Sequence, residues 1–130
     1  PQVEENGKTV SSHHWTSPLK NAEASCLPCH SNMDEEGIVK LAESIQKPVV
    51  ERTEEVAKEI ESFIMALGEK KDSLPPETLE KLQGVHREAQ FYWDYVFVEN
   101  SEGFHNNKKA LKYLDHASTL VQEAMSDLNQ

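Results

Sequence analysis

VVERTEEVAKEIESFIMALG, residues 49–68, is the most regular segment of this 130-residue chain. Its apolar residues recur every three or four positions, which places them along one face of an α-helix. The same spacing continues upstream past Pro48, although proline removes a backbone donor and crowds the preceding turn. We therefore expect one long helix with a kink at this proline. It should begin near Asn32 or Asp34 and end at Gly68. Its apolar face comprises Ile38, Leu41, Ala42, Ile45, Val49, Val56, Ile60, Phe63 and Leu67.

Two further helices are predicted by start and stop signals in the second half of the chain. SLPPETLE, residues 73–80, places two prolines at a helix entry, and the periodic pattern then runs to Gly103. Asn106 or Asn107 is a suitable cap for a last helix that reaches the C-terminus. Because all three apolar faces step close to a heptad, we expect an all-α fold in which residues 33–130 form an elongated bundle of long antiparallel helices. An intrachain core explains these faces best, and the alternative is that a second subunit covers part of them.

Residues 1–32 differ from the rest, because glycine, prolines and clustered serines interrupt any helical period. We expect an irregular segment here. CLPCH, residues 26–30, lies within it and holds the only two cysteines of the chain. Two thiols at this spacing can add to the two vinyl groups of one porphyrin edge, and the adjacent histidine can then reach the iron. Cys26 and Cys29 are therefore candidates for covalent attachment of haem c, and His30 for its proximal iron ligand.

Two other uses of this motif stay open beside the favoured one. A structural zinc site needs four ligands, and His13, His14 and His30 could complete an unusual Cys2His2 set. A redox dithiol usually starts a helix that follows a strand, whereas the sequence before Cys26 is polar and shows no alternating apolar strand.

Charge and hydropathy exclude some classes of partner. The 13 basic and 23 acidic residues give a net charge of −10, which argues against nucleic acid, whose phosphates require a basic face. No apolar run is long enough to suggest a membrane span. Haem is attached to such motifs outside the cytoplasm, so we expect a leader on a longer precursor and a mature or excised piece here. A preparation made away from the attachment machinery is expected to carry no haem.

Two segments together resemble a known family. HHWTSPLKNAEASCLPCH, residues 13–30, and AQFYWDYVFVENSEGFHN, residues 89–106, are similar to the C-terminal part of the pentahaem, ammonia-forming cytochrome c nitrite reductases. The resemblance implies that Cys26 and Cys29 hold the last haem, with His30 as its proximal ligand. It also implies that His105 and His13 are distal ligands of other haems attached upstream. His14 is an alternative to His13, and without the resemblance His105 reads as a capping or surface histidine.

The resemblance also implies the setting of the chain. It predicts a periplasmic homodimer formed through the long helices, an upstream multihaem part of the same enzyme and an external electron donor. The family reduces nitrite at a lysine-ligated haem that lies upstream, so this segment alone is expected to be inactive. Two alternatives remain: a stand-alone small c-type cytochrome or helical electron-donor module, and a related multihaem hydroxylamine-handling enzyme. The family usually has proline where Asn107 follows the GFHN motif, which makes the local turn less certain than the histidine.

Overall fold

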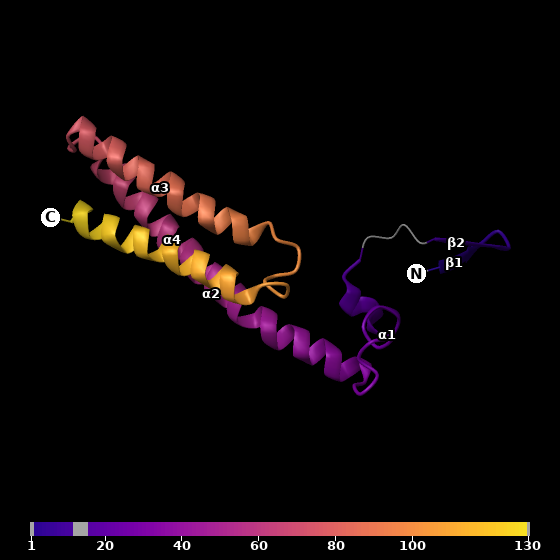
Figure 1. The fold of residues 1–130 in the computed structure, drawn as a ribbon. Coiled ribbons are helices and arrows are strands. Elements are labelled where there is room, and N and C mark those ends of the chain that lie inside the picture. Colours follow the sequence, from indigo (N-terminus) through magenta and orange to yellow (C-terminus); the bar gives the residue numbers. More distant parts are fainter. Residues whose placement is uncertain (1, 12–15, 130) are drawn as a thin grey trace. The chain divides into compact units, whose positions relative to one another are not determined.

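The computed structural model describes residues 2–11 and 16–129. Apart from one small hairpin, all of its regular elements are helices, so the predicted all-α class is confirmed. The chain forms two compact units, residues 1–44 and residues 45–130. The longest helix, α2 (Glu35–Lys70), contributes its first turns to the first unit and the remainder to the second (Figure 1).

A two-stranded hairpin begins the first unit. Strands β1 (Gln2–Glu5) and β2 (Lys8–Ser11) pair antiparallel, with Val3 opposite Val10. Asn6 and Gly7 connect them, and both have positive φ angles, 52° and 72°. Asn-Gly is the dipeptide that two-residue hairpin turns prefer, because both central residues need a left-handed backbone. The expectation of a wholly irregular segment over residues 1–32 was therefore wrong. The turn dipeptide was the available signal.

Two short helical turns follow and precede α2. A 3-10 turn, η1 (Pro18–Asn21), leads directly into the single helical turn α1 (Ala22–Ser25). The Ser17 hydroxyl accepts the Leu19 N–H and caps this start. These turns also correct the irregular reading, since proline at the first helical position and serine before it form a helix-start signal.

Helix α2 is continuous through Pro48, as expected, and the kink itself stays a prediction. Asp34 is the better of the two proposed starts, because its carboxylate accepts the Gly37 N–H at 2.8 Å. Gly68 does not end the helix, which continues for two more residues to Lys70.

The helix is unbroken at Pro48 because one proline removes a single backbone hydrogen bond, whereas the apolar residues before and after it continue the same buried face. Leu41 departs from that face and is 46% exposed.

Helices α3 (Pro76–Phe97) and α4 (Asn107–Leu128) pack with α2 in the second unit. The contacts Arg52–Asp115 and Lys70–Leu128 show that α2 and α4 run in the same direction. Figure 1 shows α3 running against both of them. The antiparallel prediction is therefore right for each pair of consecutive helices. No strand occurs among the described residues from 32 to 129.

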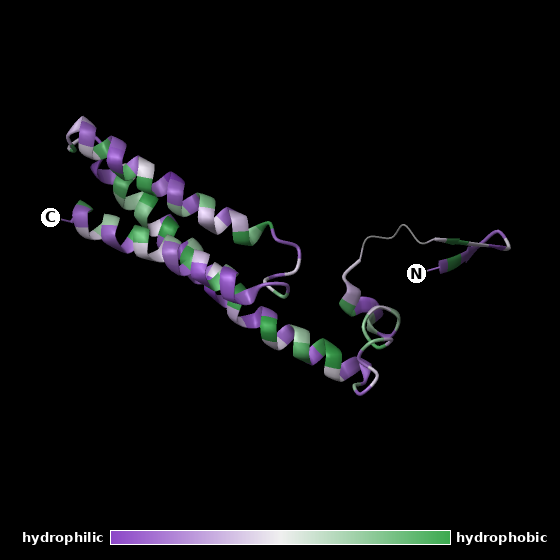
Figure 2. Ribbon diagram, viewed as in Figure 1, coloured by the Kyte–Doolittle hydropathy of each residue, from purple (hydrophilic) through white to green (hydrophobic). Residues whose placement is uncertain are grey.

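Apolar side chains fill the space between these three helices. In Figure 2 the hydrophobic residues of the ribbon, in green, alternate along these helices with hydrophilic residues, in purple. Phe63, Leu82 and Leu114 are the largest fully buried side chains. The remaining members of the core are Val49, Val56, Ile60, Leu67, Ala89, Val96, Ala117, Val121, Ala124 and Leu128.

The predicted end of α3 at Gly103 was wrong, because the helix stops at Phe97 and a loop follows.

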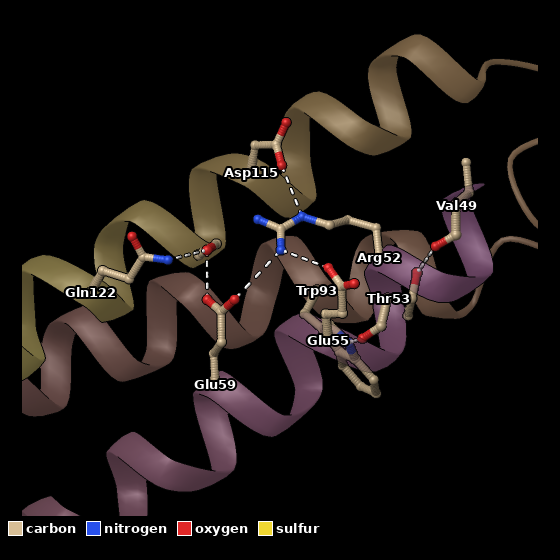
Figure 3. Close-up of polar contacts among 9 residues, drawn as sticks. Val49, Arg52, Thr53, Glu55, Glu59, Trp93, Asp115 and Gln122 are labelled. Carbon is tan, nitrogen blue, oxygen red and sulfur yellow. Dashed lines mark hydrogen bonds and ion pairs between the residues drawn. The ribbon is translucent and has the colours of Figure 1, made fainter.

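A polar network centred on Arg52 joins α2 to α4 (Figure 3). The Arg52 guanidinium donates to Asp115 at 2.9 Å and to Glu55 at 3.1 Å, and lies 3.4 Å from Glu59. Glu59 in turn accepts the Ser118 hydroxyl. Burial alone would lower the pKa of Arg52, but the carboxylates outweigh it and raise that pKa. The network favours one axial register between the two helices, because a shifted register leaves these charges unpaired.

Candidate functional site

The CLPCH motif forms a compact hydrogen-bonded turn at the end of α1. The Cys26 N–H donates to the Ala22 carbonyl at 2.8 Å, and the Cys26 carbonyl accepts the N–H groups of Cys29 and His30 at 3.2 and 3.0 Å. The His30 carbonyl then accepts the Met33 N–H at 3.0 Å. Both cysteines and the histidine are thus held by the main chain of a single turn.

Ser25 anchors the start of this turn, a role that the sequence interpretation missed. Its hydroxyl lies 2.7 Å from the Asn21 carbonyl and 2.9 Å from the Pro18 carbonyl. The same oxygen is 3.5 Å from the Cys26 sulfur. Serine in a helix often bonds back to a carbonyl four residues earlier, and that pattern was the available signal.

The exposure of the motif suits covalent attachment of a large planar group. Cys26 is partly buried, Cys29 is exposed, and neither forms a disulfide. His30 is also exposed. Two free thiols and an accessible imidazole on one turn are the donor set that a c-type haem requires. The residues present therefore fit this group.

The structure tests only one of the two alternative chemistries. Within residues 2–11 and 16–129, no group of three or more histidine, cysteine or acidic side chains is arranged to hold a metal ion. His13 and His14, which the zinc interpretation needs, lie outside the described residues, so the predicted ligand role of His13 stays a prediction as well. The dithiol interpretation needs a preceding strand, whereas Cys26 follows a helical turn.

The loop between α3 and α4 carries His105, the other candidate ligand. Glu102 and Gly103 have positive φ angles, 52° and 81°. Gln46 of α2 donates its side-chain amide to the Ser101 carbonyl at 3.0 Å. Gly103 lies directly against Val49, since a Cβ at position 103 would be 2.6 Å from a Val49 methyl carbon. The loop is thus fastened to α2 at two points.

Glu99 organises the loop from within. Its Oε1 accepts the Ser101 N–H at 3.0 Å, and its Oε2 accepts the Ser101 hydroxyl at 2.6 Å and the Gly103 N–H at 3.1 Å. The hydrogen bond from the Ser101 hydroxyl lowers the pKa of Glu99, and the two N–H groups and His105 lower it further, against the opposing effect of burial. The lowered pKa favours the ionised form of Glu99. Its role was missed in the sequence because two of its three hydrogen-bond donors are main-chain N–H groups.

His105 presents its imidazole to the outside. Its side chain is 79% exposed, and its Nδ1 lies 3.6 Å from Glu99 Oε1. The main-chain N–H of His105 donates to the Ser101 hydroxyl at 3.2 Å. Asn106 caps α4 by accepting the Lys109 N–H, as predicted. The CLPCH turn belongs to the first unit and His105 to the second.

The aromatic segment of α3 is only partly buried. Phe91 and Phe97 are each 63% exposed and Tyr95 is 51% exposed. Trp93 is partly buried and donates its indole N–H to the Thr53 carbonyl at 2.8 Å. Phe97 stacks on Trp93 with ring centres 4.6 Å apart.

Among the described residues, no helix combines the length and the apolar character needed to cross a membrane.

An all-α chain that carries a free Cys-x-x-Cys-His turn fits the c-type cytochromes as a class. The family model for cytochrome c552 matches residues 1–130. The chain therefore belongs to the cytochrome c552 family.

Individual relatives agree with this assignment. The chain is 31% identical to the cytochrome c nitrite reductase subunit NrfA of Nitratidesulfovibrio vulgaris over 91% of its length, which is 24% of that protein. It is 25% identical to cytochrome c-552 of Porphyromonas gingivalis, covering 98% of this chain and 26% of the relative. Among solved structures it is similar to cytochrome c nitrite reductase from Desulfovibrio desulfuricans, with 28% identity and a TM-score of 0.74 over 98% of this chain and 28% of the other. The chain thus spans about a quarter of the length of these relatives.

Proposed function

We propose that this chain is the C-terminal segment of a periplasmic multihaem enzyme that reduces nitrite to ammonia. The observation that carries the proposal is the free CLPCH turn in a chain whose whole length matches the cytochrome c552 family. Two relatives named as nitrite reductases cover more than nine-tenths of the chain, which supports nitrite as the substrate of the complete protein. In this proposal, the remaining haems are attached to the part of the complete protein beyond this segment.

In this proposal the turn at residues 26–30 holds one haem. Cys26 and Cys29 form the two thioether bonds, and His30 is the proximal ligand. When bound, the haem supplies an iron that takes up and passes on single electrons. The main-chain hydrogen bonds keep the backbone of both cysteines and of the histidine within one turn, which would hold the group. In this proposal the segment relays electrons and turns over no nitrite, because the lysine-ligated haem at which the family reduces nitrite lies upstream and no Cys-x-x-Cys-Lys motif occurs in this sequence.

His105 is proposed as a distal ligand of a haem attached elsewhere in the complete protein, and His13 as a ligand of another. The exposure of the His105 imidazole supports this role, since a ligand for an external iron must be reachable. In the complete haem-loaded protein, His105→Ala is expected to leave the covalent haem content unchanged and to convert one low-spin centre to another spin state. Electron paramagnetic resonance spectra identical to those of the wild type would remove His105 as a ligand.

The long helices are proposed to form a homodimer contact. Phe91 and Tyr95 on α3 and Val98 at its C-cap are spaced by four and three residues and are 63%, 51% and 70% exposed. An apolar strip at this spacing suits packing against another helix. We expect Phe91→Asp to weaken self-association in sedimentation velocity, and Glu88→Gln, an exposed change on the same helix, to leave it unchanged. Equal sedimentation of the wild type and Phe91→Asp would exclude this strip as the contact.

Covalent haem attachment gives the most direct test of the proposal. The chain, exported to a periplasm that contains the haem-attachment machinery, should gain the mass of one haem. Cys26→Ser with Cys29→Ser should gain none, and export without the machinery should give the haem-free chain. An unmodified mass in the presence of active machinery would contradict the proposal. A monomeric chain whose single haem is low-spin through two of its own side chains would support a stand-alone cytochrome instead.

A further inference from the structure

The Glu99 carboxylate is held rigidly, with one acceptor position left over. An ionised carboxylate offers about four lone-pair positions. Three are filled by the Ser101 N–H, the Ser101 hydroxyl and the Gly103 N–H. The remaining position is on Oε1, the oxygen that lies 3.6 Å from His105 Nδ1.

The separation is slightly too long for a hydrogen bond. It closes with a small rotation of the imidazole, which is free to move because it is 79% exposed. The backbone that carries the two side chains is already held in place. The Ser101 hydroxyl accepts the main-chain N–H of His105, and the Gln46 side chain donates to the Ser101 carbonyl. The fixed partner is therefore the carboxylate, and the mobile partner is the ring.

We propose that Glu99 is a positioning residue that accepts the Nδ1–H of His105, so that Nε2 is left with its lone pair directed outward as an iron ligand. This inference rests on the proposed function in one respect, namely that the metal bound by Nε2 is the iron of a haem attached elsewhere in the complete protein. A neutral imidazole carries one proton, and the hydrogen bond made by one nitrogen decides which nitrogen can coordinate a metal. Carboxylates that accept the second ring N–H of metal-bound histidines orient the ring and increase its basicity as a ligand.

The tautomer of His105 tests the inference on the chain itself, without haem. Long-range proton–nitrogen correlation spectra of the 15N-labelled chain above pH 8 distinguish Nδ1–H from Nε2–H in neutral histidine. In wild type, the ratio of Nδ1–H to Nε2–H at His105 should exceed that in the urea-unfolded chain by about two- to tenfold, the range that one net hydrogen bond contributes. Glu99→Gln should return the ratio to the unfolded value.

Two further variants separate positioning from simple loop folding. Glu102→Gln removes an exposed carboxylate from the same loop and should leave the ratio as in wild type. Ser101→Ala removes a hydroxyl that anchors the loop but keeps the carboxylate beside the ring, so most of the preference should remain. Equal loss of the preference in Ser101→Ala and Glu99→Gln would assign Glu99 a folding role only and overturn the inference. An unfolded-like ratio in the wild type would overturn it as well.

A second measurement separates this inference from the proposed function. In the complete haem-loaded protein, Glu99→Gln should shift the low-spin signal that His105→Ala abolishes. If His105→Ala changes no signal, the ligand role fails, while the tautomer measurement still decides whether Glu99 orients the ring. If His105→Ala abolishes a signal that Glu99→Gln leaves unshifted, the ligand role stands and the positioning role fails.

Discussion

Replacing Gly103 by alanine should destabilise the protein through two separate effects. The first is backbone strain, because Gly103 has a φ of 81°, and an L-residue in the left-handed region costs roughly 1–2 kcal/mol. The second is a steric clash, because an added Cβ would lie 2.6, 2.9 and 3.0 Å from three carbon atoms of Val49. Val49 is 1% exposed and belongs to the core, so it has little room to withdraw. Overpacking of this kind costs roughly 1–3 kcal/mol.

The sum predicts that Gly103→Ala lowers the free energy of unfolding by about 2–5 kcal/mol. Urea unfolding of the complete chain, followed by circular dichroism at 222 nm, measures this change. Gly84→Ala is the matched control, because Gly84 lies within α3 and an added Cβ there meets nothing within 4 Å. Alanine at a helix interior should stabilise the protein by about 1 kcal/mol relative to glycine.

A double mutant separates the two effects. Val49→Ala alone should cost about 2–3 kcal/mol, because it removes two buried methyl groups and leaves a cavity. Val49→Ala removes the two methyl carbons at 2.6 and 2.9 Å and leaves only the Cβ at 3.0 Å, so most of the clash of Gly103→Ala is relieved and the backbone strain remains. The double mutant should therefore be more stable than the sum of the single mutants predicts, by roughly 1–3 kcal/mol. Additive effects, or a neutral Gly103→Ala, would refute the argument that this loop is packed against α2.

Three further changes test the bundle by the same urea assay. Arg52→Met should lower the free energy of unfolding by about 1–3 kcal/mol, because the Arg52 side chain is 24% exposed and joins Glu59 to Asp115. Lys47 forms a pair with Glu51 in which the side chains are 72% and 61% exposed, so Lys47→Met should change the free energy of unfolding by less than about 0.5 kcal/mol. Similar effects of the two substitutions would contradict the network. Trp93→Phe should cost about 0.5–1.5 kcal/mol through loss of the indole bond to the Thr53 carbonyl, and unchanged stability would show that this bond contributes nothing. Leu114→Ala should cost about 2–5 kcal/mol because the side chain is fully buried, whereas Leu41→Ala, 46% exposed, should cost well under half as much.

The candidate site was partly predictable from the sequence. The CLPCH motif needed no structure, because its five consecutive residues carry the chemistry themselves. His105 could be selected only through the resemblance to a family, since a single histidine at a helix junction has no chemical signature of its own. Glu99 and Ser25 were missed because most of their contacts are with main-chain groups. Such contacts depend on backbone conformation, which no spacing of side chains encodes.

The sequence by itself determined the helices and the attachment motif. Apolar periodicity and cap residues act over three or four positions, so Asp34, Pro76 and Asn106 mark helix starts regardless of what packs against them. The tertiary structure alone decided how the loop after α3 approaches α2, because Val49 leaves room only for a glycine at position 103. It also decided which aromatic residues are exposed, because the two neighbouring helices α2 and α4 can cover only part of a helix that is aromatic on several sides. Long-range packing and main-chain hydrogen bonds act between residues far apart in the sequence, and for that reason local patterns do not reveal them.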